Sequence, residues 1–477
     1  MQPLWIDQIA TALDTGRDRL LVVAADGTGW TGAELHARVG GAATLLDTGG
    51  CTPGNVVPAL LTTRPETLAV TIAGAATGRP LAPLSPRLTI AELTDCLTNL
   101  PGQVLLAEPG SAEVGEQLTR VTGRRLVLVD ELATDAPVPE LTAAPADIAF
   151  VLHTSGTTGR PRRVDVREDR MGARAIVSTR LMRLTADSVF TISSPFHHIA
   201  GLGNIAVAMA AGSRVVAFGR FSVDAWRGLA DLGVTHAQSI PTMIETLLRA
   251  DAFALPTLRL LQYGASPIHP DTLRRALAAM PDIAFVNLLG QTEGAPLTCL
   301  TPQDHRQAAA GAEGLLRSVG RPIAEIELRI DRPDESGVGE IQARGTHLFQ
   351  PGPDGWLHTG DLGRLDERGY LYLVGRKGDM IIRGGENVYP LEVEHTLARH
   401  AGVAEAAVVG VPDERVGELV MAFVVPSDPA SPPDPAELRA FARGTLSGFK
   451  VPERWEFLAE LPRNPNGKVL RRALKPR

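Results

Sequence analysis

Apolar positions along the first 145 residues change their spacing repeatedly, and the alternation predicts an α/β fold. Residues 6–13, 33–46 and 91–97 carry the three-to-four-residue apolar spacing typical of helices. Short continuous apolar runs at 20–24 and 56–61 are typical of strands. Glycines and prolines separate these segments, so we expect helices and strands to alternate.

A further apolar run at 148–152 leads without interruption into the sequence TSGTTGRPRR at 154–163. This order predicts a buried strand that ends in a loop. Apolar runs also precede LQYGASPI at 261–268 and LLGQTEG at 288–294. Both segments are therefore expected to be loops at the carboxyl ends of strands, where open α/β sheets bind ligands.

The last hundred residues predict a separate, smaller α/β unit. A helix is expected to begin near Pro390, followed by strands at 406–411 and 421–425. A proline-rich spacer at 428–435 then precedes another helix.

Composition narrows the class of protein. A chain of 477 residues is too long for one ordinary core and predicts two or more domains. The net charge of −7 argues against nucleic acid or an anionic membrane surface as a partner. The longest apolar run, 199–211, is broken by glycines and Asn204 and is too short to span a bilayer. We expect a soluble protein.

The three cysteines, Cys51, Cys96 and Cys299, are odd in number and far apart, which argues against a disulfide framework or a CxxC metal site. The N-terminus carries Asp7 among apolar residues and lacks a basic start, so it is not typical of a secretion signal. Both features favour a cytoplasmic location.

Residues 154–163 have the composition of an anion-binding loop. Gly156 and Gly159 allow backbone angles at which N–H groups turn inward as a nest. Hydroxyl groups and three arginines add hydrogen-bond donors and positive charge for a polyphosphate. A solvated Ser/Thr/Gly turn with a basic face fits the local chemistry equally well. No Gly-Lys-Ser/Thr follows, so the segment is not a Walker A loop.

Two adjacent histidines, His197 and His198, lie in SPFHHIAGLG at 194–203. Neighbouring residues cannot share one helical face, so a paired metal site is improbable, and packed or helix-capping histidines are the common alternative. The residues 201–206 also match a dinucleotide fingerprint formally. No strand leads directly into that segment and no acidic residue follows at the needed distance, which argues against this interpretation.

Three polar positions nearer the C-terminus are further candidates. Asp361 lies in GWLHTGDLG, a predicted tight turn, where its carboxylate could accept both hydroxyls of a ribose. Arg376 follows the apolar sequence LYLV and offers a second sugar contact. Lys468 lies in an Asn/Gly/Pro loop, where a long cation can reach a neighbouring domain, although most lysines are simply solvated.

Taken in order, these segments resemble the motifs of the adenylate-forming superfamily, which includes acyl-CoA synthetases, peptide-synthetase adenylation domains and luciferases. At least six motifs in the family's order cover residues 150–472. The resemblance implies a large N-terminal domain of αβ-layered subdomains at 1–377. It implies a small, mobile C-terminal α/β domain at 378–477, which rotates between two half-reactions.

The resemblance also implies roles for individual residues. Lys468, Glu293 and His198 would be catalytic, with Glu293 helping to hold Mg²⁺ and His198 at the acyl pocket. A Thr-Glu pair such as Thr292-Glu293 fits a helix N-cap equally well. The implied contacts to ATP and AMP are Thr154, Ser155, Gly156, Thr157, Thr158, Gly159, Arg162, Gly264, Ala265, Ser266, Leu289, Gly290, Gln291, Thr292, Asp361 and Arg376.

In this family a carboxylate attacks the α-phosphate of ATP, and a thiol then displaces AMP from the acyl-adenylate. Coenzyme A is the expected thiol, and the phosphopantetheine of a carrier protein is the alternative. Amino-acid-activating relatives have an aspartate at the position of His198, so an α-amino acid is not expected. Small or apolar neighbours favour a hydrophobic acid: Leu202, Ile205, Ala206, Ala208 and Met209.

Four positions depart from the family pattern. Arg162 and Arg163 replace Lys-Gly after the phosphate loop, Leu289 replaces an aromatic that stacks on adenine, and Gly378 replaces an Asp or Lys hinge. Weak adenylation is therefore an alternative, with the protein acting chiefly on a preformed acyl-adenylate. A binding protein without catalysis is another, but retention of Glu293, Asp361, Arg376 and Lys468 argues against it.

Overall fold

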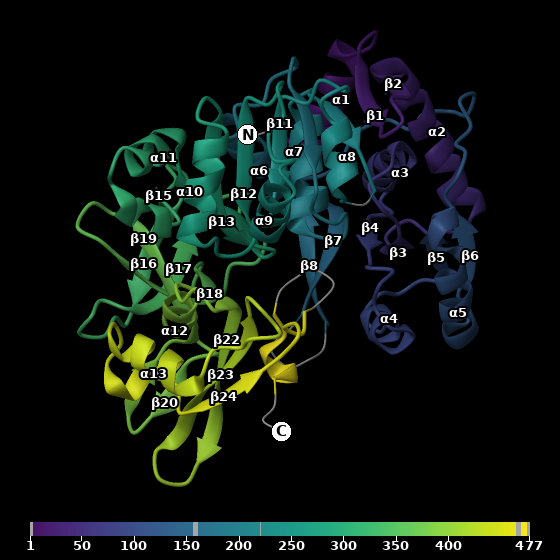
Figure 1. Cartoon of the computed structure of the whole chain (residues 1–477). Helices are drawn as coiled ribbons and strands as arrows, with labels where there is room; N and C mark the ends of the chain where they lie inside the picture. Colours follow the sequence, from purple (N-terminus) through teal and green to yellow (C-terminus); the bar gives the residue numbers. More distant parts are fainter. Residues whose placement is uncertain (1–2, 156–160, 220, 464–468, 475–477) are drawn as a thin grey trace. The chain divides into compact units, whose positions relative to one another are not determined.

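The computed structural model describes residues 3–155, 161–219, 221–463 and 469–474, without the side chains of 155 and 161. The chain forms two compact units (Figure 1). Unit 1 contains Met1–Glu327 and Ala343–Leu357, and unit 2 contains Leu328–Gln342 and His358–Arg477. These units are defined by packing alone, so the boundary expected at residue 377 stays a prediction.

Unit 1 contains a six-stranded sheet in the order β6-β5-β3-β4-β7-β8. Its neighbouring strands are parallel except for β7 and β8, which are antiparallel. The strands are β3 (Val57–Leu60), β4 (Leu81–Pro83), β5 (Val104–Ala107), β6 (Arg125–Leu128), β7 (Ile148–Ser155) and β8 (Pro161–Arg167). The associated helices are α3 (Pro65–Ala76), α4 (Ile90–Leu97), η1 (Pro109–Ser111) and α5 (Ala112–Thr122).

A nine-stranded sheet also belongs to unit 1, in the order β15-β14-β13-β12-β11-β9-β10-β1-β2. The six strands from β13 to β1 are parallel, and antiparallel strands close both ends. The strands are β1 (Leu20–Ala24), β2 (Gly29–Thr31), β9 (Val189–Ile192), β10 (Arg214–Ala217), β11 (His236–Ser239), β12 (Leu260–Gly264), β13 (Ala284–Gln291), β14 (Gly294–Leu300) and β15 (Arg321–Pro322).

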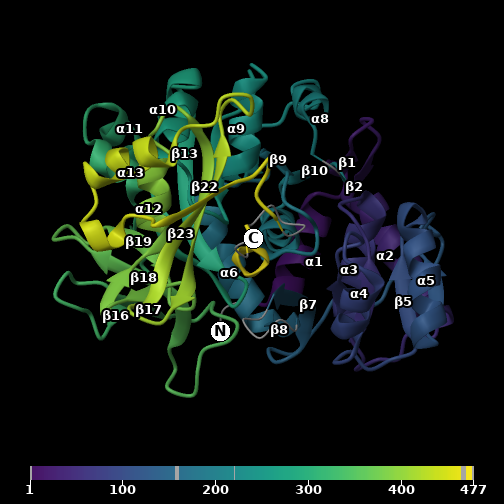
Figure 2. The same ribbon diagram turned by 60° about the horizontal axis from the view of Figure 1, so that its bottom comes forward.

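Further helices belong to unit 1. They are α1 (Trp5–Thr15), α2 (Gly32–Thr48), α6 (Glu168–Leu181), a π-helical turn η2 (Ile199–Gly203), α7 (Asn204–Ala210), α8 (Val223–Gly228), α9 (Pro241–Arg249), α10 (Pro270–Ala279), α11 (Pro302–Ala309) and η3 (Glu313–Arg317). One buried cluster joins strands of both sheets to α1, α2, α3, α6 and α7, and α2 and α3 run side by side in Figure 2. A second cluster packs α4 and α5 on the other face of the six-stranded sheet, as expected for parallel strands.

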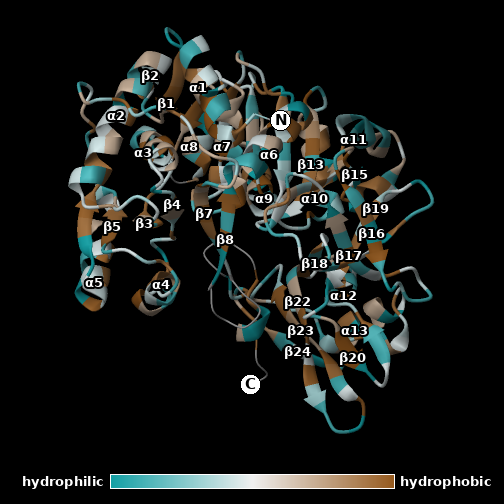
Figure 3. Cartoon of the chain, turned by 180° about the vertical axis from the view of Figure 1, so that it is seen from behind, coloured by the Kyte–Doolittle hydropathy of each residue, from teal (hydrophilic) through white to brown (hydrophobic). Residues whose placement is uncertain are grey.

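Unit 2 contains most of a four-stranded sheet and all of a five-stranded sheet. The first, β16-β17-β18-β19, consists of Glu327–Asp331, Gly339–Arg344, Leu357–Leu365 and Leu371–Arg376. The second contains β20 (Ile381–Arg383), β21 (Glu386–Val388), β22 (Val403–Asp413), β23 (Gly417–Pro426) and β24 (Arg454–Phe457), with helices α12 (Pro390–Leu397), α13 (Pro435–Arg443), η4 (Gly448–Lys450) and η5 (Arg471–Ala473). Hydrophobic residues follow much of β22 and β23 in Figure 3, because both faces of this sheet are covered.

The fold class expected from the sequence is confirmed. The predicted helices near 6–13, 33–46 and 91–97 are α1, α2 and α4, and the predicted strands at 20–24 and 56–61 are β1 and β3. In the last hundred residues, α12, β22, β23 and α13 follow in the predicted order. The three cysteines are buried free thiols. Among the described residues, no helix has the length and apolar character needed to cross a bilayer.

Candidate active site

The described parts of the segment expected to bind phosphate lie on the antiparallel strands β7 and β8, and β8 is an edge strand of the six-stranded sheet. The antiparallel ladder places Thr154 opposite Arg162 and His153 opposite Arg163. The prediction that the loop begins at Thr154 is wrong, because the ladder extends β7 to Ser155 and starts β8 at Pro161. Thr154, Ser155 and Arg162 are strand residues. The expected contacts Gly156, Thr157, Thr158 and Gly159 lie outside the described residues.

The two arginines that replace Lys-Gly have different surroundings. Arg162 is exposed, and no carboxylate among the described residues pairs with it. Arg163 instead extends along its own strand, with Nε 2.5 Å from Oδ1 of Asp165 and a longer bond of 3.4 Å to the Asn99 carbonyl. Arg162 is therefore the better placed of the two to meet a phosphate.

His153, which the sequence patterns did not single out, lies beside this pair on β7. Burial and, to a smaller extent, the positive charge of Arg163 lower the pKa of its imidazole against an opposing effect of Asp165, and the pKa is about 4. The ring is thus neutral at pH 7. Alternation of side chains along β7 places His153 and Arg163 on one face, a neighbourhood that follows only from strand register.

The acyl-motif segment forms a single π-helical turn after β9. His198 precedes the turn, and its backbone carbonyl accepts from the N–H of Gly201 at 3.0 Å. A Cβ atom at position 201 would overlap the Pro195 carbonyl, so the close approach of these two segments requires glycine. The rings of His197 and His198 are 4.3 Å apart and both half-buried. Single π turns of this kind are frequent at functional sites.

Strands β12 and β13 present the next two motifs. Gly264 ends β12 opposite Leu288, and a Cβ there would lie 2.7 Å from the Leu288 carbonyl. Ala265 follows with a left-handed φ of 67°, which costs a non-glycine residue about 1 kcal/mol, and Ser266 is exposed beside it. The loop predicted at 261–268 is therefore shorter than expected, because Leu261–Gly264 belong to β12 and the exposed turn begins only at Ala265.

The motif containing Glu293 is largely strand rather than loop. Leu289, Gly290 and Gln291 belong to β13, and only Thr292 and Glu293 form the turn that leads into β14. Gly290 sits at a bulge where a Cβ would overlap Ala295 on the returning strand. The Glu293 carbonyl accepts from the N–H groups of Phe349 and Gln350 at 2.9 and 3.2 Å, which fixes the turn. The alternative of a helix N-cap at Thr292 is excluded, because β14 follows.

These motifs of unit 1 meet at one sheet edge. The segment containing His198 follows β9, Ala265 follows β12 and Glu293 follows β13, and all three strands are parallel members of the nine-stranded sheet. Carboxyl ends of parallel strands share an edge, so topology brings together residues up to 95 positions apart. Arg174 of α6, which sequence patterns did not indicate, bonds to two of these segments directly.

The two expected sugar contacts pair with each other in unit 2. Asp361 lies on β18 directly opposite Arg376 on β19, and Nε of the arginine is 2.8 Å from Oδ1 of the aspartate. Asp361 is a strand residue, so its predicted place in a tight turn is wrong. The backbone N–H of Asp361 donates to the Thr359 hydroxyl. That hydroxyl in turn donates to the Ile341 carbonyl at 2.7 Å. The carboxylate is 19% exposed and can still be reached by a ligand.

The C-terminal candidate, Lys468, lies outside the described residues. Three residues later, Arg471 makes a forked pair with Glu394 of α12 at 2.7 and 2.8 Å and contacts Asp379 at 3.2 Å. Burial opposes the charge of Arg471, but the carboxylates of Glu394 and Asp379 outweigh it and raise the pKa of the guanidinium. Asp379 follows the expected hinge, Gly378, where a Cβ would meet no neighbouring atom.

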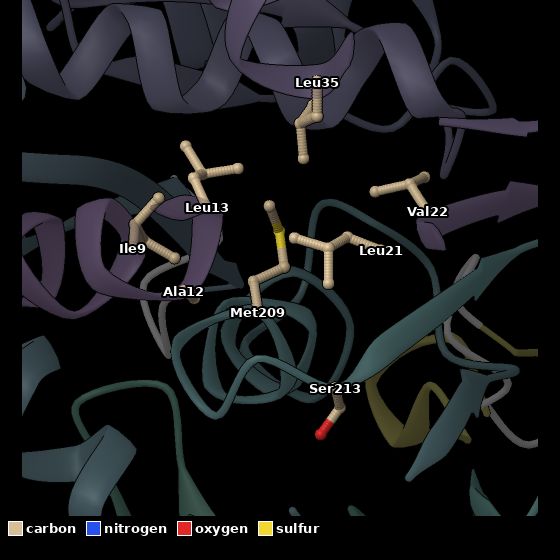
Figure 4. Close-up of a pocket in the computed structure, with 8 residues that line it drawn as sticks. All are labelled: Ile9, Ala12, Leu13, Leu21, Val22, Leu35, Met209 and Ser213. Carbon is tan, nitrogen blue, oxygen red and sulfur yellow. The ribbon is translucent and has the colours of Figure 1, made fainter. Parts of the chain in front are cut away.

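Two hollows of unit 1 lie away from these motifs. A cavity of about 10 Å³ is lined by apolar side chains of α1, β1 and α2 together with Met209 and Ser213, and it is too small for a substrate (Figure 4). An open polar cleft of about 270 Å³ borders the amino ends of β9, β11, β12 and β13. That cleft is at the opposite sheet edge from His198 and Glu293.

Five apolar residues expected near the acyl pocket are buried in the core of unit 1: Leu202, Ile205, Ala206, Ala208 and Met209. Met209 lines the small cavity beside α1, and the Ala206 carbonyl accepts from the indole of Trp5 at 3.0 Å. Helix α7 therefore turns this face toward α1. Packing by itself accounts for the apolar character of these residues, and the acyl pocket expected beside them stays a prediction.

Comparison with known proteins identifies the family. The chain matches the model of the AMP-binding enzyme over residues 10–351 and that of the AMP-binding enzyme C-terminal domain over 392–468. It is 34% identical to a fatty acid–[acyl-carrier-protein] ligase of Streptomyces coeruleorubidus, over 95% of this chain and 93% of that protein. It is 33% identical to a feruloyl-CoA synthase of an Amycolatopsis species, over 94% of each chain.

Solved structures agree with this assignment. The o-succinylbenzoate CoA synthetase of Bacillus subtilis, in complex with its acyl-adenylate intermediate, superposes with a TM-score of 0.88 at 28% identity, covering 100% of this chain and 98% of that one. An amide bond synthetase of Marinactinospora thermotolerans superposes with a TM-score of 0.87 at 28% identity, covering 99% of each chain. The chain belongs to the AMP-binding enzymes of the adenylate-forming superfamily and is an ATP-dependent acid–thiol ligase.

Proposed function

We propose that the protein is an acyl-CoA synthetase that activates a hydrophobic carboxylic acid. The acid carboxylate attacks the α-phosphate of ATP and pyrophosphate leaves, which forms an acyl-adenylate. The thiol of coenzyme A then attacks the acyl carbon and AMP leaves. The convergence of the segments containing His198, Ala265 and Glu293 at one sheet edge carries this proposal. The names of the fatty acid, feruloyl and indoleacetate ligases among the relatives favour a hydrophobic acid.

In the first step two anions approach each other, so the site needs concentrated positive charge and donors. The hydroxyls and amides of 154–159, Arg162 and Lys468 would supply them. Gly264, Ala265, Ser266, Leu289, Gly290, Gln291 and Thr292 would surround the adenine, and Asp361 with Arg376 would bind the ribose. The Asp361–Arg376 pair suits this role because the carboxylate accepts from hydroxyls while the arginine donates.

The carboxylate of Glu293 is suited to bind a magnesium ion that is also bound by ATP. No described side chain donates to its carboxylate, and the turn that carries it is fixed through the Glu293 backbone carbonyl. Mg²⁺ commonly takes one or two protein carboxylates and completes its shell with phosphate oxygens and water. No cluster of three potential metal ligands occurs among the described residues.

Two variations on the proposed function have specific support. The similarity to a fatty acid–[acyl-carrier-protein] ligase favours a carrier-protein thiol as an alternative acceptor. The pairing of Arg163 with Asp165 favours weak adenylation, since this arginine is already paired with a carboxylate, and Leu289 offers no aromatic ring to stack on the adenine. In that case the enzyme would chiefly convert a preformed acyl-adenylate to a thioester.

The test is ATP–pyrophosphate exchange with a panel of fatty, cinnamic and arylacetic acids, run beside thioester formation from the synthetic adenylate of each. Brisk exchange with one acid, followed by thioester formation with coenzyme A, is expected. Slow exchange beside fast thioester formation would instead establish the weak-adenylation alternative. A carrier protein and a free amine are offered as competing acceptors. No exchange and no thioester from any pair would refute the proposal.

A further inference from the structure

Arg174 is a buried cation without a buried anion. It lies in the middle of α6 with only 3% of its surface exposed, and among the described residues no carboxylate pairs with it. Arg79, another buried arginine, pairs with Asp47 at 2.8 Å. Burial lowers the pKa of Arg174 to about 9, which still leaves it charged at pH 7. Burying an unpaired charge is unfavourable unless its hydrogen bonds compensate for the lost hydration. The acceptors of Arg174 are therefore the place to look for its role.

The three nitrogens of the guanidinium bond to three different acceptors. Nε donates to the Ala295 carbonyl at 3.1 Å, and one Nη donates to the Gly203 carbonyl. The other Nη donates to Oδ1 of Asn204 at 2.6 Å, whose amide in turn donates to Gln262 at 3.4 Å. The planar fork of arginine fixes the angles between these acceptors, which a lysine ammonium could not do.

Gly203, Ala295 and Gln262, the partner of the third acceptor Asn204, each adjoin one motif of the candidate site. Gly203 ends the π turn that starts after His198, Gln262 lies two residues before Gly264, and Ala295 lies two residues after Glu293. The Pro296 carbonyl next to Ala295 accepts from buried His347 at 2.8 Å. Strands β12, β13 and β14 are also held by their ladder bonds, but the π turn belongs to no ladder. Loss of Arg174 should therefore free the π turn more than the strands.

We infer that Arg174 is a positioning residue that holds the π turn at 199–203, and with it the acyl side of the site, against β12 and β14. The inference rests on the proposed function for its effect on catalysis, but its structural part stands without it. Arg174 touches neither acid nor nucleotide in this scheme. It acts through the Gly203 carbonyl and Asn204, so its removal should impair use of the acid and leave ATP binding intact.

The test compares Arg174→Met with Arg180→Met, a control on the same helix whose arginine pairs with Glu325 at the surface. Hydrogen exchange measures the amides of 199–204 without any substrate. We expect at least tenfold faster exchange there in Arg174→Met, with no change in α9 or in the control. Unchanged exchange at 199–204 would overturn the inference, whether or not the protein proves to be a synthetase.

The kinetic test uses the acid that the wild type activates fastest in the panel. The assay temperature lies well below the thermal unfolding midpoint of each variant. We expect kcat/KM for the acid to fall at least tenfold in Arg174→Met while the KM for ATP stays within twofold. Equal losses for acid and ATP, or a lowered midpoint with normal kinetics, would show a merely structural role and refute the positioning role.

Asn204→Ala guards against a variant that fails to fold, because it removes one of the three acceptors and keeps the charge. Like Arg174→Met, it should speed up hydrogen exchange at 199–204 and lower kcat/KM for the acid, but by smaller factors. In the double variant the two losses should be less than multiplicative, since Arg174 acts partly through Asn204. Fully multiplicative losses would contradict the inferred link. If the wild type activates no acid, the proposed function fails separately. The hydrogen-exchange result then still decides whether Arg174 holds the π turn.

Discussion

At the scale of single residues, Glu168 shows how burial changes one carboxylate. Its side chain is fully buried at the start of α6, where Oε2 accepts from the Ile6 N–H at 2.9 Å. Burial raises its pKa from 4.5 to about 7, with a smaller contribution from the charges of Asp7 and Asp147. The folded protein therefore holds this proton more tightly than the unfolded chain, and the resulting stability is lost as pH rises from 4.5 through 7.

Glu168→Gln keeps an acceptor for Ile6 and removes the titration. The shift from 4.5 to about 7 corresponds to roughly 3 kcal/mol. We expect the wild type to lose about that much unfolding free energy, relative to the variant, between pH 4.5 and pH 8.5. Urea unfolding at both pH values measures it, with exposed Glu113→Gln as the control. A wild type and variant that respond equally to pH would contradict the buried titration.

Asp361 is a residue whose role can be separated from stability. Asp361→Ala should weaken AMP binding by about 1.5–3 kcal/mol, the scale of hydrogen bonds to a charged group. Its partner Arg376 is 45% exposed and returns to water, so unfolding free energy should change by less than about 1 kcal/mol. Calorimetric titration with AMP measures the first and urea unfolding the second. Exposed Glu367→Ala, just beyond β18, is the control, and an unchanged AMP affinity for Asp361→Ala would remove Asp361 from the site.

At the scale of elements, Arg471 joins the C-terminal segment to α12 and to Asp379, the residue after the expected hinge. Arg471→Met would leave Glu394, 11% exposed, without its charged partner. Breaking a buried pair in this way typically costs about 3–5 kcal/mol. Because Lys468 lies three residues earlier in the chain, adenylation should fall as well. Arg472→Met, next to it and exposed, should change stability by less than about 0.5 kcal/mol.

The measurements are chemical unfolding and ATP–pyrophosphate exchange for both arginine variants. Normal exchange in a folded Arg471→Met protein would show that the Glu394 pair does not position the segment that contains Lys468. Equal losses in Arg471→Met and Arg472→Met would point instead to a general effect of positive charge near the C-terminus.

At the scale of the whole molecule, the proposed rotation about Gly378 can be tested by backbone chemistry alone. A Cβ at this position meets no neighbouring atom, so a side chain by itself is tolerated sterically. Proline fixes φ near −65° and removes the N–H, so Gly378→Pro should restrict the hinge while Gly378→Ala does not. We expect the proline variant to lose at least tenfold in one half-reaction and keep the other.

Adenylate formation is measured by pyrophosphate exchange, and thioester formation is measured from a synthetic adenylate. Both half-reactions should remain within threefold of wild type in Gly378→Ala. If Gly378→Pro leaves both rates intact, the pivot lies elsewhere in the chain. If alanine and proline impair the same step equally, the effect is one of side-chain bulk rather than of backbone rotation.

The sequence by itself determined the alternation of elements, because apolar spacing and Gly/Pro punctuation are local properties. It also determined the family, since the order of the motifs from Thr154 to Lys468 is a property of the chain that does not depend on tertiary packing. The residue types needed for phosphate, ribose and thiol chemistry could be read from the same motifs.

Only the tertiary structure decided which of these residues meet, and how. Ladder pairing extended β7 through Ser155 and placed Asp361 in a strand opposite Arg376. Packing placed the apolar residues of α7 in the buried core of unit 1. Arg174 carries no local signal, because its importance comes from acceptors 29 to 121 residues away along the chain. Burial and long-range contact are properties of the folded chain, and they set the pKa of Glu168 and the partners of Arg174.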